Sequence, residues 1–343
     1  MKMAPTQNIP VAYRLLAVCR NVSAHTANEF NSTIFTESIM AQGQMQGYIR
    51  PYNATFGWRL SPQGYELLRE HGFSYLADQH TQRVGRRFEH AAVASTMLAA
   101  AISPFLESLT QLREESGYLP ALSLRARKGQ NVLGSSQLMG LLRLHTKLFA
   151  VYWVTEGDHI LTPEREIDSL ARLALGANCK NYGIIFCGDS YSGIWSILNQ
   201  QYSLERKSRR EKKPYAALYQ TAPCECLLLP TTNVGVEQLR ILQTPDYPAR
   251  LNQIFQLTDG TVQHCHAHRN AVNLPVRYGM DMNLKETVLA ARQARAGRYR
   301  QLILCALRGQ DIFLRHVLRS EGCEVTVLTP AVLEQLYRMG GAP

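Results

Sequence analysis

Residues 36–68 read TESIMAQGQMQGYIRPYNATFGWRLSPQGYELL, and their pattern predicts the fold of the first part of the chain. Its first twelve residues, 36–47, predict a helix with Thr36 as N-cap, because a threonine hydroxyl can accept a hydrogen bond from the first helical turn. Two short strands are predicted at residues 48–52 and 55–60, joined by a tight turn. The stretch therefore predicts a helix followed by a β-hairpin.

The flanking segments extend this unit. Residues 11–18 space their apolar side chains as a helix does, and residues 23–30 predict a second helix capped by Ser23. After the hairpin, Pro62 opens a fourth helix at its first position, where proline is favoured. Three helices, a hairpin and a helix are the element order of a winged helix-turn-helix, which we therefore expect for residues 1–75.

A winged helix-turn-helix favours binding to double-stranded DNA. Its third helix fits a major groove about 12 Å wide, and glutamine can form two hydrogen bonds with adenine. Arginines beside the hairpin can hold backbone phosphates. Winged helices also bind proteins, so an interaction scaffold is an alternative function. The predicted DNA contacts of this unit are Ser38, Gln42, Gln44, Gln46, Arg50 and Arg59.

Positive charge is concentrated in one short segment of the chain. The 343 residues carry a net charge of +10, and residues 206–213 alone contain six basic side chains and one acidic one. We interpret residues 206–214 as a basic linker, which either stays solvated or clamps phosphates without sequence preference. The corresponding predicted DNA contacts are Lys207, Arg209, Arg210, Lys212 and Lys213.

Beyond the winged helix, helical and strand patterns alternate, which predicts a mixed α/β fold with a mixed sheet. We divide this part into a nuclease-like α/β domain at residues 80–205 and a C-terminal α/β region at residues 215–343. The first of them contains a strand predicted at residues 122–127 and a hairpin predicted from residues 137–144 and 148–155.

The element order over residues 86–188 is helix, three strands, helix and strand, which is the core order of PD-(D/E)xK nucleases. Such nucleases hold Mg²⁺ with carboxylates on two neighbouring strands. Here the predicted hairpin strands, QLMGLLRL and LFAVYWVT, contain no carboxylate, and Glu156 and Asp158 follow them without a nearby lysine. We therefore expect the nuclease-like core to lack its active site. We also expect the protein to be noncatalytic and to bind no cofactor. A divergent metal-dependent nuclease is an alternative.

A dense group of possible metal ligands lies at residues 264–268, which read HCHAH. On a strand, His264, His266 and His268 would share one face and could bind zinc, with Cys226 as a fourth ligand. The usual CxxC or HxxxH spacing is missing, so the pattern favours a polar edge strand or loop, and a zinc hydrolase is kept as an alternative. The motif Cys224-Glu225-Cys226 adds two thiols.

The remaining patterns bear on cellular location. No apolar run reaches the roughly 18 to 20 residues needed to cross a bilayer, and the first residues lack the apolar core of a signal peptide. Most of the eight cysteines lie in apolar runs, where reduced thiols are ordinary. We expect a cytoplasmic protein without membrane association.

The segment RLSPQGYELL is followed by FEHAAVASTMLAA, and together they resemble the replication-relaxation family of bacterial plasmids and integrative elements. In this family a short motif joins the end of the wing to the next helix, and it is matched here by Arg59, Leu60, Ser61, Gly64, Leu67 and Leu68. His90 lies where the family carries a histidine at the start of the following helix. The segments LFAVYWVTEG and LILCALRGQDIFL are similar to the corresponding segments of family members from conjugative elements.

This resemblance implies a winged helix joined to a degenerate nuclease-like domain. It also implies DNA binding in replication, mobilisation or regulation of a mobile element. The expected partners are double-stranded DNA, replication or transfer proteins, and a second copy of the chain.

Overall fold

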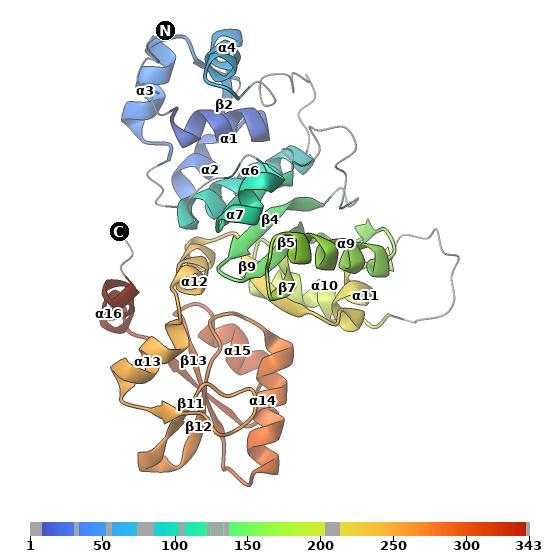
Figure 1. Ribbon diagram of the computed structural model, residues 1–343, viewed down its shortest axis with the longest axis vertical. Helices are drawn as coiled ribbons and strands as arrows, with labels where there is room; N and C mark the ends of the chain where they lie inside the picture. The colour runs from blue at the N-terminus through green and yellow to red at the C-terminus, as the bar shows by residue number, and fades with distance from the viewer. Residues whose placement is uncertain are drawn as a thin grey trace.

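The computed structural model describes residues 9–30, 34–52, 57–73, 86–102, 106, 108–121, 124, 133, 137–202 and 213–340. Helices pack around two five-stranded mixed sheets and two small two-stranded sheets, which confirms the predicted mixed α/β class. Figure 1 shows the first helices at the top, the central sheet in the middle and the second large sheet at the bottom. Within these described ranges, no helix is both long and apolar enough to span a membrane.

The N-terminal unit has the predicted order of three helices, a hairpin and a helix. Serine or threonine caps start three of its helices: the hydroxyls of Ser23, Thr36 and Ser61 each accept a backbone N–H from the residue three positions on. Its elements are α1 (Val11–Cys19), α2 (Ala24–Glu29), α3 (Glu37–Met45), β1 (Ile49–Pro51), β2 (Trp58–Leu60) and α4 (Pro62–Glu70).

Helix α6 (Arg86–Ala101) joins this unit to the rest of the molecule. One continuous apolar core contains residues of α1, α6 and α12 (Asn233–Gln243) together with one face of the central sheet. The imidazole of His90 on α6 also stacks on Trp153 of that sheet, with the ring centroids 4.3 Å apart. The N-terminal unit is therefore packed onto the α/β part through α6.

The central sheet has the strand order β3-β4-β5-β7-β9. The first three strands are antiparallel, which confirms the predicted hairpin, and β5, β7 and β9 run parallel. Its elements are α7 (Leu109–Glu114), β3 (Gly117–Pro120), β4 (Leu138–Leu144), β5 (Lys147–Trp153), α9 (Pro163–Gly176), β7 (Asn181–Gly188), α10 (Tyr191–Leu198), α11 (Tyr215–Thr221) and β9 (Glu225–Pro230).

Both faces of this sheet are buried. In β5, Phe149, Val151 and Trp153 join the core shared with α6 and α12. The alternating residues Leu148 and Ala150 face a second core that includes α9, α10 and α11. A strand covered on both faces is apolar along most of its length, and β4 and β5 accordingly carry no carboxylate.

Two sequence predictions need correction. The strand predicted at residues 122–127 falls mostly outside the described residues, where only Leu124 is placed and is helical. The strand that pairs with β4 on the side away from β5 is β3, which was not among the predicted strands. The basic segment also does not separate two sheets, because β9 follows it and pairs with β7, so the central sheet continues past the predicted boundary at residue 215.

The second large sheet has the order β10-β11-β12-β13-β14, with β12, β13 and β14 parallel. Helices α14 and α15 connect the parallel strands, as the alternating pattern predicted. Its elements are α13 (Tyr247–Phe255), β10 (Thr258–Asp259), β11 (Ala267–Arg269), β12 (Leu274–Tyr278), α14 (Leu284–Ala296), β13 (Leu302–Ala306), α15 (Asp311–Val317), β14 (Cys323–Val327) and α16 (Pro330–Gly340).

The shared core gives a test with two methionines. Met97 on α6 is fully buried in that core, whereas Met45 on α3 is 89% exposed. We expect Met97→Ala to lower the free energy of unfolding by about 2 to 5 kcal/mol, because it removes buried methylenes and leaves a cavity. Met45→Ala should change it by about 0.5 kcal/mol or less. Urea denaturation of both variants checks this, and equal small effects would contradict a core that passes through α6.

Candidate functional site

Helix α3 presents a polar face to solvent. Ser38, Gln42, Gln44 and Gln46 are all exposed, as the sequence predicted, and Met45 lies among them. The opposite face of the helix is held by Met40, which is buried, and by Gly43. The four residues named as DNA contacts are therefore all open to solvent, three on α3 and Gln46 at its C-cap.

Gly43 allows α3 to lie close to the hairpin and to α1. A Cβ atom at this position would approach the Ile49 side chain to 2.7 Å and the Tyr13 hydroxyl to 2.8 Å. Real Cβ atoms do not come this close to other heavy atoms, so a larger residue would require the ends of the Ile49 and Tyr13 side chains to move. The glycine that weakens the helix by propensity thus leaves room for these two side chains.

Three arginines gather beside the hairpin. Arg50 and Arg59 lie directly opposite each other on β1 and β2, and the guanidinium of Arg59 lies 4.3 Å from the centroid of the Tyr52 ring. Burial raises the pKa of Tyr65, and the nearby charges of Arg20, Arg59 and Arg50 oppose that rise. Within the described ranges, neither Arg50 nor Arg59 forms an ion pair with a carboxylate. Both guanidinium groups can therefore contact an anionic ligand.

The basic segment is only partly described. Lys207, Arg209, Arg210 and Lys212 lie outside the described residues. Lys213 belongs to β8 (Lys213–Pro214), which pairs with β6 (His159–Ile160). Its ammonium lies 3.4 Å from the Glu164 carboxylate. This lysine is therefore part of the fold and carries a carboxylate partner, unlike the solvated linker residue that the sequence suggested.

The three histidines of the HCHAH segment do not share one face of a strand, which was the arrangement considered for a zinc site. Only Ala267–Arg269 forms a strand, β11, and His264 has a left-handed backbone with φ of 65°. His264 contacts Glu286 at 2.5 Å, and His268 hydrogen-bonds Asn273 at 3.1 Å.

His266 has a partner different from those of His264 and His268: its Nδ1 accepts a hydrogen bond from the Tyr278 N–H at 3.0 Å. The proposed fourth ligand, Cys226, lies on β9 and is fully buried in another core. Across the part of the chain that the structure describes, no three histidine, cysteine or acidic residues are arranged to hold a metal ion.

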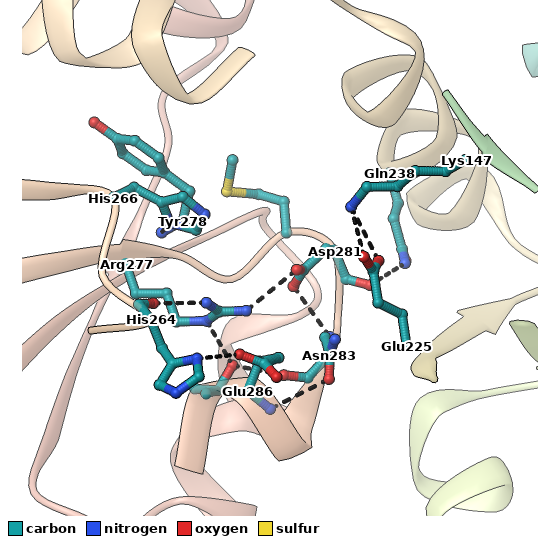
Figure 2. Close-up of polar contacts among 12 residues, drawn as sticks. Lys147, Glu225, Gln238, His264, His266, Arg277, Tyr278, Asp281, Asn283 and Glu286 are labelled. Atoms are coloured by element: carbon teal, nitrogen blue, oxygen red, sulfur yellow. Dashed lines mark hydrogen bonds and ion pairs between the residues drawn. The ribbon is translucent and has the colours of Figure 1, made fainter. Parts of the chain in front are cut away.

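A cleft of about 470 Å³ lies between the two large sheets. Lys147, at the start of β5, donates to both carboxylate oxygens of Glu225, at the start of β9, at 2.8 and 3.0 Å. His266 and Asp281 line the opposite side, and Tyr247 lies at the start of α13. Figure 2 shows the Lys147–Glu225 pair facing Asp281. The cleft thus offers carboxylates, an ammonium and an imidazole to a small polar ligand.

A buried arginine fixes the Asp281 side of the cleft. Arg277 is 4% exposed, and its guanidinium contacts the Asp281 carboxylate at 3.3 Å and the His264 carbonyl at 2.8 Å. Its Nε also donates to the Thr287 hydroxyl at 3.2 Å. The other carboxylate oxygen of Asp281 accepts the Asn283 N–H at 3.0 Å. These contacts orient Asp281 rigidly at the end of β12 (Figure 2).

Sequence reasoning found part of these sites. It identified Arg50 and Arg59, because they lie on the strands of a recognisable hairpin. It missed Arg20, which approaches the hairpin only through the packing of α1. It also missed the pair Lys147 and Glu225, since 78 positions separate them. The parallel strands β5, β7 and β9 begin at the same edge of the sheet, so the two residues meet there across β7.

Comparisons with known proteins add no relative. No protein-family model, no curated protein and no solved structure matches the chain.

The cleft histidine gives a pH test. Burial, then the charge of Arg277, lowers the pKa of His266 from 6.5 to about 4. The unfolded chain therefore binds a proton at this position between these two values while the folded chain does not, so stability falls as pH drops through this window. We expect His266→Asn, whose side-chain oxygen can replace Nδ1 as acceptor, to lose less stability between pH 6.5 and 4 than the wild type.

Urea denaturation at a series of pH values measures this dependence. His268→Asn is the matched control, because it removes a neighbouring imidazole of the same segment. Identical pH profiles for His266→Asn and the wild type would contradict a neutral, buried His266.

Proposed function

We propose that the protein is a noncatalytic double-stranded DNA-binding protein and that its N-terminal unit acts as a winged helix. The observation that carries the proposal is the exposed polar face of α3 next to the arginines at Arg20, Arg50 and Arg59. We place its role in replication, mobilisation or regulation of a bacterial mobile element, on the sequence resemblance described above.

In the proposed mechanism, α3 enters the major groove and its glutamines contact base edges. An amide side chain can donate and accept at the same time, which matches the paired donor and acceptor of adenine. Arg50 and Arg59 hold the phosphate backbone beside the hairpin, where guanidinium groups form charge-assisted hydrogen bonds. The phosphates would position the protein, and the glutamines would provide sequence preference.

The α/β part is proposed to keep a nuclease-like core order without catalysis. The hairpin strands β4 and β5 carry Arg143 and Lys147 as their charged residues, and no carboxylate. The nearby buried acid, Glu166, accepts a hydrogen bond from the Tyr152 hydroxyl at 2.6 Å and so has a structural contact. We propose that this part mediates self-association or binds replication or transfer proteins.

The central test is the salt dependence of binding to labelled duplex DNA by the full-length chain. The logarithm of the affinity should fall linearly with the logarithm of the salt concentration. Arg50→Ala/Arg59→Ala should weaken binding to all sequences and reduce that slope by about 2, since each lost phosphate contact removes about one unit.

The charge-matched control is Arg172→Ala/Arg319→Ala, which removes two exposed arginines on other elements. It should keep nearly the wild-type slope. An equal loss in both double variants would mean that only net charge matters. Absence of binding at low salt would remove the proposal and direct the search to protein partners.

The glutamines should behave differently from the arginines. After selection of a preferred duplex from a random library, Gln42→Ala/Gln44→Ala should lose discrimination against other sequences by about 1 to 3 kcal/mol for each lost base contact. Nonspecific binding should change little, because no phosphate contact is removed. Competition binding with preferred and scrambled duplexes measures sequence discrimination and nonspecific affinity separately. Unchanged discrimination would exclude α3 as the helix that recognises the base sequence.

A further inference from the structure

Two thiols lie side by side where β9 begins. Cys224 precedes the strand and Cys226 is its second residue, and the Cys226 thiol lies 3.5 Å from the carbonyl oxygen of Cys224. Cys226 is fully buried, whereas Cys224 is half-buried and reachable from solvent. A half-buried cysteine is therefore followed, two residues on, by a fully buried one whose thiol reaches back to its backbone.

A lysine from another element lies near these thiols. Lys285 on α14 donates to the Tyr219 carbonyl, and its ammonium lies 4.6 Å from the centroid of the Tyr219 ring. It is held in this place by a hydrogen bond and by the aromatic face, and its charge favours a thiolate at both cysteines. Tertiary packing thus brings one positive charge, that of Lys285, close to the two thiols.

The two cysteines differ in acidity. The hydrogen bond from the Cys226 thiol lowers the pKa of Cys224 against the effect of burial, and Lys285 lowers it further, while Glu225 opposes. The same hydrogen bond and burial raise the pKa of Cys226. Burial raises the pKa of the six other cysteines, Cys19, Cys179, Cys187, Cys265, Cys305 and Cys323.

We propose that Cys224 and Cys226 form a redox-active dithiol, in which Cys224 attacks low-molecular-weight disulfides and Cys226 resolves the mixed disulfide. In the first step the Cys224 thiolate bonds to one sulfur of the disulfide R–S–S–R, and the other sulfur leaves as a thiolate, RS⁻. Cys226 then attacks the Cys224 sulfur, and its proton passes to the departing sulfur, so that the second half of the disulfide leaves as RSH. Two protein thiols are oxidised, and one external disulfide is reduced to two thiols.

This reaction would change the cleft between the sheets. The new disulfide encloses Glu225, the residue whose carboxylate accepts both hydrogen bonds from Lys147. Joining its two neighbours moves the start of β9, so the oxidised protein presents a different cleft rim. The inference rests on the thiols alone and does not depend on DNA binding.

The test begins with the unmodified full-length protein. Limited alkylation with iodoacetamide at neutral pH, followed by peptide mass spectrometry, should modify Cys224 about tenfold faster than the half-buried Cys179 and Cys323. After incubation with oxidised glutathione, the intact mass should fall by two hydrogen atoms, and the peptide containing residues 224–226 should carry the disulfide. Alkylation of Cys224 no faster than of Cys179 would overturn the proposal.

Two variants separate the roles of the thiols. Cys226→Ser should accumulate a stable glutathione adduct on Cys224, because no resolving thiol remains, whereas Cys224→Ser should form neither an adduct at this position nor a disulfide. The matched control Cys323→Ser should react as the wild type does. A glutathione adduct that persists on Cys224 in the wild type would show that Cys226 does not resolve it, and would also overturn the proposal.

Discussion

The two large sheets are bridged by one buried side chain, Gln238, within an apolar core that both share. Its amide nitrogen donates to the Leu228 carbonyl on β9 at 2.9 Å and to the Asp281 carbonyl after β12 at 3.1 Å. Its oxygen accepts the Tyr191 hydroxyl at 2.6 Å, and that hydroxyl accepts the Gln310 amide at 2.9 Å. Both glutamines are almost fully buried, and leaving one such group without a partner costs about 1 to 3 kcal/mol. The sheets therefore have one favourable register.

That register creates the candidate sites of the α/β part. It places Asp281 opposite the pair of Lys147 and Glu225, so groups from both sheets line one cleft. It also brings α14 against β9, which sets Lys285 close to Cys224. Binding chemistry and thiol chemistry thus arise at the same junction. Each would be lost if the sheets were separate domains joined by a flexible linker.

Much of the fold could be predicted because its signals are local. The caps at Ser23, Thr36 and Ser61 and the alternation of strands and helices act over a few residues, and the structure has these elements nearly as expected. The strand predicted at residues 122–127 shows the limit of this reasoning. Apolar alternation indicates that a segment can pair with another strand, but it does not say with which one. In the structure, residues 117–120 pair with β4.

The sequence by itself determined the α/β class, the order of the N-terminal helices and hairpin, and a polar face on α3, because periodicity and capping require only neighbouring residues. Tertiary structure decided which distant groups meet. It gave the three histidines at residues 264–268 separate partners, attached the N-terminal unit through α6, and paired Lys147 with Glu225. These outcomes depend on strand order and on buried hydrogen bonds between elements far apart in the chain, and no local pattern encodes them.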